Sequence, residues 1–137
     1  MHIRHKIAGG DFVNAGNVAS SVKKILRQLN VDHQAAKRIV ISLYEAEVNV
    51  VAHAYSGIAD VDIEKEKVVI KVEDQGPGIA DIEKAMVDGY STATPQVREM
   101  GFGAGMGLSN MKKNSDKMTL TSEPGKGTAV ELITYLD

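Results

Sequence analysis

The chain has 137 residues, which fits one domain with one hydrophobic core, so we expect a single domain over residues 1–137. Its 43% hydrophobic and 25% charged residues are typical of a soluble globular protein, and a formal charge of −2 argues against nonspecific binding to nucleic acid or anionic membranes. The absence of cysteine excludes disulfides and thiolate chemistry, the sequence shows neither a signal peptide nor an apolar run of ~20 residues, and we expect a cytoplasmic protein without a membrane span.

The beginning of the chain predicts a strand and then an amphipathic helix. His2–Ala8 alternates in the manner of an edge strand, and the glycine pair that follows ends it. Apolar residues at helical spacing between positions 18 and 29 mark one stripe of a helix. Asp11 and Asn14 are both candidates to cap that helix.

A second, longer helix and a pair of strands come next. The helix is predicted from about residue 33 to 55, with Asp32 as its cap, and it is apolar on most faces, which indicates burial. Residues 59–64 and 67–74 then predict two strands joined by a short charged turn.

The last third of the chain predicts a short helix over 82–87 and a long loop over 88–107 that is rich in glycine, serine and threonine. A further helix over 107–114 precedes two strands, 117–122 and 128–136, whose glycine-rich connection predicts a hairpin. Strands joined by hairpins with helices between them favour a two-layer α/β sandwich, with a mostly antiparallel mixed sheet and its helices on one face.

An acid–amide pair lies in the second helix. Glu45 and Asn49 are four residues apart and therefore share one face. Carboxylate and amide oxygens are the ligands that Mg²⁺ prefers, so Asn49 is a candidate metal ligand and Glu45 a candidate general base. Glu47 lies about 200° around the helix from Glu45 and should face away from Asn49. The ordinary alternative for Glu45 is an ion pair with a lysine.

Asp74 ends the second strand of the first pair, on the same side as the apolar face of that strand. A carboxylate in this place requires a hydrogen-bond donor, and the exocyclic amine of adenine is one. Gly76 and Gly78 would let a base approach the backbone closely. An ordinary Asp-x-Gly turn is the alternative.

Glycines alternate at positions 101, 103, 105 and 107 and lead into a predicted helix. Backbone N–H groups and a helix N-terminus together bind phosphate, so this segment predicts a phosphate-binding lid, which we expect to lack order without nucleotide. The lysine and serine or threonine of a P-loop are absent, as is the strand of a dinucleotide fingerprint. A glycine-rich loop without such a function is the alternative.

Together these segments resemble the ATP-binding motifs of the GHKL superfamily of gyrase, chaperone, histidine kinase and mismatch-repair ATPases. The short length, and the stretches 73–79 and 88–92, are most similar to the bacterial anti-sigma-factor serine/threonine kinases, in particular the stressosome switch-kinase type. The similarity covers nearly the whole chain and is strongest over 37–127. Residues 93–100 make the lid longer than in the switch kinases.

The resemblance implies a GHKL (Bergerat) fold, ATP and Mg²⁺ as ligands, and transfer of phosphate to a serine or threonine of a STAS-domain protein. Glu45 would take the proton from the substrate hydroxyl, Asn49 would hold Mg²⁺, and Asp74 would contact adenine. A sigma factor or a phosphatase is a further candidate partner, and the chain would be a monomer or a homodimer. The implied nucleotide-binding set is Asn49, Asp74, Gly76, Gly78, Ile79, Ser91, Thr92, Arg98, Gly101, Gly103, Ala104, Gly105, Met106, Gly107, Leu108 and Thr128.

Three other functions stay open. A regulatory or anti-sigma binding module would hold ATP with little turnover and use it to select a partner. A histidine-kinase catalytic domain would require a helix with a phosphoacceptor histidine, for which this chain is short. A stand-alone ATPase would release phosphate without a partner.

Overall fold

The computed structural model describes residues 1–78 and 107–136. These residues form β1 (His2–Ala8), α1 (Asn17–Gln28), α2 (His33–His53), β2 (Ser56–Ile63), β3 (Lys67–Gln75), α5 (Gly107–Lys113), β4 (Lys117–Glu123) and β5 (Gly127–Tyr135). The predicted helix over 82–87 and nearly all of the predicted loop over 88–107 lie outside the described residues.

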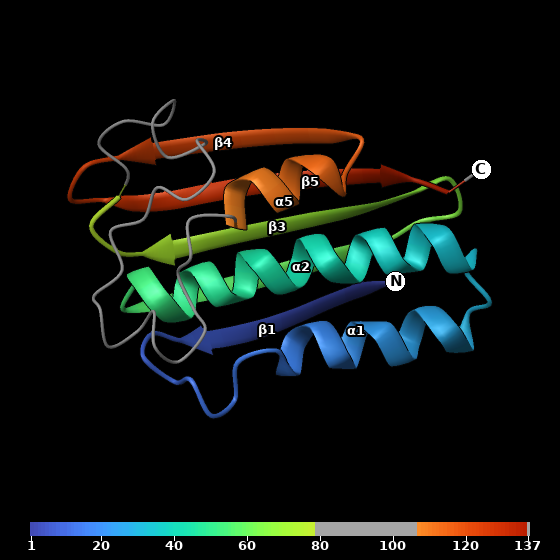
Figure 1. Ribbon diagram of the computed structural model, residues 1–137, viewed down its shortest axis with the longest axis horizontal. Helices are drawn as coiled ribbons and strands as arrows, with labels where there is room; N and C mark the ends of the chain where they lie inside the picture. Colours follow the sequence, from blue (N-terminus) through green and yellow to red (C-terminus); the bar gives the residue numbers. More distant parts are fainter. Residues whose placement is uncertain (79–106, 137) are drawn as a thin grey trace.

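The strands make a five-stranded sheet in the order β1-β2-β3-β5-β4, covered on one face by α1, α2 and α5 (Figure 1). The predicted two-layer sandwich is therefore confirmed. The sheet was expected to be mostly antiparallel, and all four neighbouring pairs of the described strands are antiparallel. Figure 1 shows the reason at the first edge: α1 leads away from the end of β1 and α2 leads back beside it, so β2 starts where β1 ends.

The core lies between the sheet and the helices. Alternate residues of β3, Val68, Ile70 and Val72, face the helices and are almost completely buried. They pack with the apolar stripe of α1 and with α2, which is buried along most of its length. The largest fully buried side chains of this layer are Leu26, Ile39, Leu43, Ile70, Met111 and Leu132.

The predicted cap of α2 is confirmed, since Asp32 Oδ2 accepts a hydrogen bond of 3.0 Å from the N–H of Ala35. The predicted caps of α1 are wrong. Its N-cap is Gly16, which has a positive φ and no side chain to donate or accept a bond. Asp11 and Asn14 instead bond to each other, with Asn14 Nδ2 2.9 Å from Asp11 Oδ2.

The cap of α1 comes from Glu47 of α2. Its Oε2 accepts from the N–H groups of Gly16 at 3.0 Å and Val18 at 3.1 Å, and its Oε1 accepts from Ala19 at 3.0 Å. The residue is only 2% exposed. The positive end of the α1 dipole and its free N–H groups thus stabilise a buried carboxylate. Glu47 is therefore committed to α1, a role that the sequence did not predict, since its position around the helix predicted only that it faces away from Asn49.

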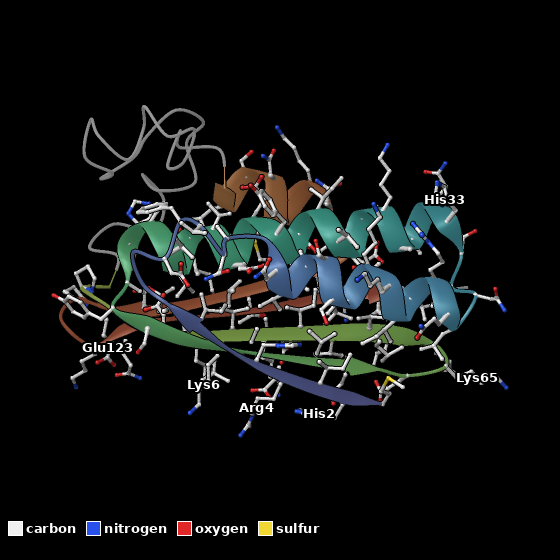
Figure 2. The ribbon with its side chains drawn as sticks, turned by 90° about the horizontal axis from the view of Figure 1, so that it is seen from below. His2, Arg4, Lys6, His33, Lys65 and Glu123 are labelled. Atoms are coloured by element: carbon white, nitrogen blue, oxygen red, sulfur yellow. The ribbon has the colours of Figure 1, made fainter. Side chains whose placement is uncertain are left out.

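The other face of the sheet carries charged side chains. His2, Arg4 and Lys6 project from β1 away from the helices (Figure 2). Arg4 Nε lies 2.7 Å from Asp60 Oδ1 on β2, and Lys71 Nζ lies 3.6 Å from Glu131 Oε2. This is the polar, solvated face of an antiparallel sheet. Among the described helices, none is long and apolar enough to cross a bilayer.

Candidate nucleotide-binding site

The predicted site residues come from four elements that meet toward one end of the molecule, at the left of Figure 1. The C-terminal part of α2 lies above the end of β3, where the N–H of Tyr55 donates to the Gln75 carbonyl at 2.9 Å. The start of β5 adjoins that strand end, and α5 packs on α2. These contacts bring Glu45, Asp74 and Thr128 to the same region of the fold.

Glu45 belongs to α2 and is half-buried where α5 packs on that helix. Asn110 Nδ2 donates a hydrogen bond of 3.3 Å to Glu45 Oε1. Burial raises the pKa of the Glu45 carboxyl, and the hydrogen bond from Asn110 opposes part of that effect. Within the described parts of the chain, no lysine or arginine forms an ion pair with Glu45. In the described part of the chain, Glu45 is therefore held by a neutral amide and not by a cation.

Asn49 follows one helical turn later and is also half-buried. No group of three or more histidine, aspartate or glutamate side chains in residues 1–78 and 107–136 is arranged for a metal ion. A protein site made only of such side chains is therefore absent from these ranges. The single amide oxygen of Asn49 suits an ion that takes most of its ligands from phosphates and water, as Mg²⁺ does.

Asp74 is half-buried at the end of β3. Its Oδ1 accepts from the N–H of Thr128 at 3.0 Å, while Oδ2 makes no hydrogen bond with another described residue. Burial raises the pKa of the Asp74 carboxyl, and the bond from Thr128 works against that rise. An ordinary Asp-x-Gly turn would direct the carboxylate to the backbone two residues further on. Here it reaches across to β5 and keeps one oxygen for a ligand.

The glycines after β3 are required by the protein's own packing. A Cβ on Gly76 would lie 3.0 Å from Ala54 Cα and 3.2 Å from Asp74 Oδ1. Gly78 has φ +77°, and a Cβ there would collide with the carbonyl oxygen of Glu123. We predicted that these glycines let a base approach the backbone closely. Among the described residues, what lies close to them is the end of α2 and the β4–β5 hairpin.

Three other predicted residues lie at this end of the fold. Thr128 contributes its backbone N–H, and its hydroxyl is 3.0 Å from Ser122 Oγ. Gly107 begins α5, where a Cβ would lie 3.5 Å from Glu45 Oε2. Leu108 is buried in the hydrophobic core and fixes α5 to it.

The remaining predicted residues stay predictions because they lie outside the described part of the chain. They are Ile79, Ser91, Thr92, Arg98, Gly101, Gly103, Ala104, Gly105 and Met106. The expected lid belongs to the same range.

Two residues of this site had no role in the sequence interpretation. Asn110 is one asparagine of a short helix, and nothing in its spacing pointed to Glu45. Gly127 was assigned only to a hairpin turn. It has φ +110°, and a Cβ there would collide with the carbonyl oxygen of Asp74. In the sequence, the two glycines of the turn, at 125 and 127, were the signal that could have pointed to this constraint on the backbone.

Comparison with known proteins gives a family match and close relatives. Residues 34–137 match the model of the histidine kinase-, DNA gyrase B- and HSP90-like ATPases. The serine/threonine-protein kinase RsbT of Bacillus subtilis strain 168 is 35% identical over 132 residues, covering 92% of this chain and 90% of RsbT. The anti-sigma F factor of Thermoanaerobacter sp. strain X514 is 35% identical over 114 residues, covering 80% of this chain and 76% of that protein.

Solved structures share the fold. The structure of the RsbU and RsbW domains of Rv1364c from Mycobacterium tuberculosis superposes with a TM-score of 0.64 at 17% identity, covering 98% of this chain and 32% of that chain. A chain of the SiaB–SiaC complex from Pseudomonas aeruginosa gives 0.59 at 9% identity, covering 97% and 89%. At these identities the likeness concerns the fold alone.

Proposed function

The chain belongs to the histidine kinase-, DNA gyrase B- and HSP90-like ATPase family, and from this we propose that it binds Mg²⁺ and ATP and phosphorylates a STAS-domain protein. It is a partner-switching regulator of the serine/threonine-kinase type, similar to RsbT and to anti-sigma F factors. A sigma factor or a phosphatase is the second partner that we propose. The cysteine-free chain suits the reducing cytoplasm, which is the location we propose.

The observation that carries the kinase proposal is the state of Glu45. A pure nucleotide-binding module needs no base, yet this carboxylate is half-buried, has a raised pKa and is held by a neutral amide. A carboxylate whose pKa is raised by burial is a stronger base than an ordinary glutamate, which suits proton abstraction from a hydroxyl. Glu45 would accept the proton of the substrate hydroxyl as the hydroxyl oxygen bonds to the γ-phosphorus of ATP. The bond from that phosphorus to the β–γ bridging oxygen would break, and ADP would leave.

The other residues would bind and orient. Asp74 Oδ2 would accept a hydrogen bond from the exocyclic amine of adenine, while Oδ1 stays on Thr128. Asn49 would supply one oxygen to Mg²⁺, which when bound neutralises charge on the phosphates. We propose that Gly101, Gly103, Gly105 and Arg98 complete the site around the phosphates, with Ser91 and Thr92 beside them.

Phosphate transfer from γ-labelled ATP to a candidate STAS-domain protein tests this function. Glu45→Gln should lower the transfer rate by roughly 10²–10⁴-fold, the usual contribution of a general base, while calorimetry shows unchanged ATP affinity. Asp74→Ala should instead abolish saturable ATP binding. Transfer by Glu45→Gln at the wild-type rate would remove Glu45 from the mechanism. If the wild-type chain gives no saturable heat with ATP and Mg²⁺, the nucleotide assignment fails.

The similarity to anti-sigma F factors favours one second candidate, a module in which bound ATP governs the choice of partner with little turnover. The same two assays separate it from the kinase. A binding module saturates with ATP and binds its partner in an ATP-dependent manner, yet transfers no label, and Glu45→Gln leaves that partner binding unchanged.

A further inference from the structure

Helix α5 donates a hydrogen bond to one oxygen of the Glu45 carboxylate and passes beside the other. Asn110 Nδ2 lies 3.3 Å from Oε1, and the Cβ position of Gly107 lies 3.5 Å from Oε2. Gly107 and Asn110 are three residues apart and therefore share one face of the helix. Among the described residues, the hydrogen bond to this carboxylate is confined to Oε1, and Gly107, a residue without a side chain, lies beside Oε2.

The position of α5 does not depend on this contact. Leu108 and Met111 anchor the helix in the core, and Met111 is only 1% exposed. Ser115 Oγ donates to the Met111 carbonyl at 2.8 Å, and Asn114 Nδ2 donates to the Asn110 carbonyl at 2.9 Å. The amide of Asn110 therefore projects toward Glu45 from a backbone that is fixed by other residues.

The torsion that turns a glutamate carboxyl group is broad, so burial alone leaves the plane of the carboxylate free to rotate. One donor on Oε1 fixes that plane and with it the direction of the other oxygen. The donor is also neutral. A lysine or arginine in its place would lower the pKa of Glu45 and make it a weaker base. The lysines of α5, Lys112 and Lys113, are exposed to solvent.

We propose that Asn110 is a positioning residue, whose side-chain amide holds Oε1 of Glu45 and leaves Oε2, beside Gly107, to accept the proton of the substrate hydroxyl. The inference rests on the proposed function of Glu45 as the base. It adds that α5, through one neutral hydrogen bond, fixes the plane of the carboxylate so that its second oxygen faces the substrate.

Steady-state phosphoryl transfer by the full chain tests this with Asn110→Leu, which keeps similar volume and removes the donor. The kcat should fall about tenfold, the effect of one lost positioning hydrogen bond, while KM for ATP and the calorimetric Kd stay within twofold. Asn110→Gln, which restores an amide, should recover part of the loss. Lys112→Ala is the control on the same helix, because that side chain is exposed to solvent, and its kcat should not change.

A double-mutant cycle identifies the route of the effect. On a Glu45→Gln background, Asn110→Leu should have no further effect on kcat, because the base on which it acts is gone. Circular dichroism checks that each variant is folded, and Asn110→Asp, of nearly identical shape, replaces Asn110→Leu if that variant is not. Asn110→Asp should also lose kcat, since a carboxylate cannot donate to Oε1.

An unchanged kcat in the folded Asn110 variant, or the same fractional loss with and without Glu45, would overturn the proposal while leaving Glu45 as the base. Absence of transfer by the wild-type chain, or full transfer by Glu45→Gln, would overturn the proposed function first and this inference with it. The two failures are therefore distinguishable in one set of assays.

Discussion

Replacing Glu47 by alanine should destabilise the protein severely, although the residue takes no part in the proposed chemistry. Its carboxylate accepts three backbone N–H bonds of 3.0–3.1 Å at the start of α1 and is almost completely buried. A hydrogen bond to a charged group contributes about 1.5–3 kcal/mol, and the three donors would lose their acceptor together. Because such losses are not additive, we expect a decrease of about 3–5 kcal/mol in the free energy of unfolding.

That decrease is a large part of the roughly 5–15 kcal/mol available to a domain of this size. The melting temperature should fall by about 10–20 °C, from roughly 3–5 °C per kcal/mol for a chain of intermediate length. Urea unfolding followed by circular dichroism at 222 nm measures the free energy directly. Glu47→Gln should be intermediate, because its amide oxygen can keep two of the three donors while its NH₂ group faces the third.

Glu45→Gln is the matched control for Glu47→Gln. It makes the same substitution two residues away on the same helix, at a half-buried position without a capping role. Its stability should not fall. A Glu47→Ala curve within about 1 kcal/mol of the wild type, with an unchanged denaturant slope, would refute the capping role of Glu47 and the magnitude that follows from it.

Three more results are expected. Gly127→Ala should lower both the stability of the fold and its ATP affinity, because the new Cβ collides with the Asp74 carbonyl. Gly125 also has a positive φ but open space around it, so Gly125→Ala should lower the free energy of unfolding, measured by thermal unfolding, by only about 1 kcal/mol. Asp74→Asn keeps an acceptor for Thr128 but presents a donor to the adenine amine, so calorimetry should show about 10–100-fold weaker ATP binding; unchanged affinity would exclude the proposed contact. The raised pKa of Glu45 has two consequences. The transfer rate should fall on acidification at a pH above the ordinary glutamate range. Because the folded state binds this proton more tightly than the unfolded state, the charge destabilises the fold at neutral pH, so Glu45→Gln should raise the melting temperature at pH 7 and lose that advantage below the ordinary glutamate pKa.

Local patterns predicted the elements well. Asp32 was identified as the cap of α2 because a cap and its helix are adjacent in sequence. The hairpins followed from short turns between alternating segments, and the pairs β2–β3 and β4–β5 confirm them. Glu45 and Asp74 were both assigned roles from spacing and parity within one element, and those roles stay predictions.

Contacts between distant segments could not be predicted in this way. The cap of α1 is supplied by Glu47, about thirty residues later in the chain, while two nearer candidates with suitable side chains bond to each other. Asn110 reaches Glu45 only because α5 packs on α2. Gly127 is constrained by the backbone of β3, which no local turn pattern reveals. In each case the deciding partner belongs to another element.

The described sheet ends in β1 at one edge and β4 at the other, and each edge strand leaves backbone groups available to a neighbouring molecule. On β1, His2, Arg4 and Lys6 occupy every second position, so a second copy aligned along this edge would bring like charges together. The alternation of cationic residues thus discourages edge-to-edge aggregation. Replacing Arg4 and Lys6 by valine would leave the core intact and make the protein prone to association along this edge.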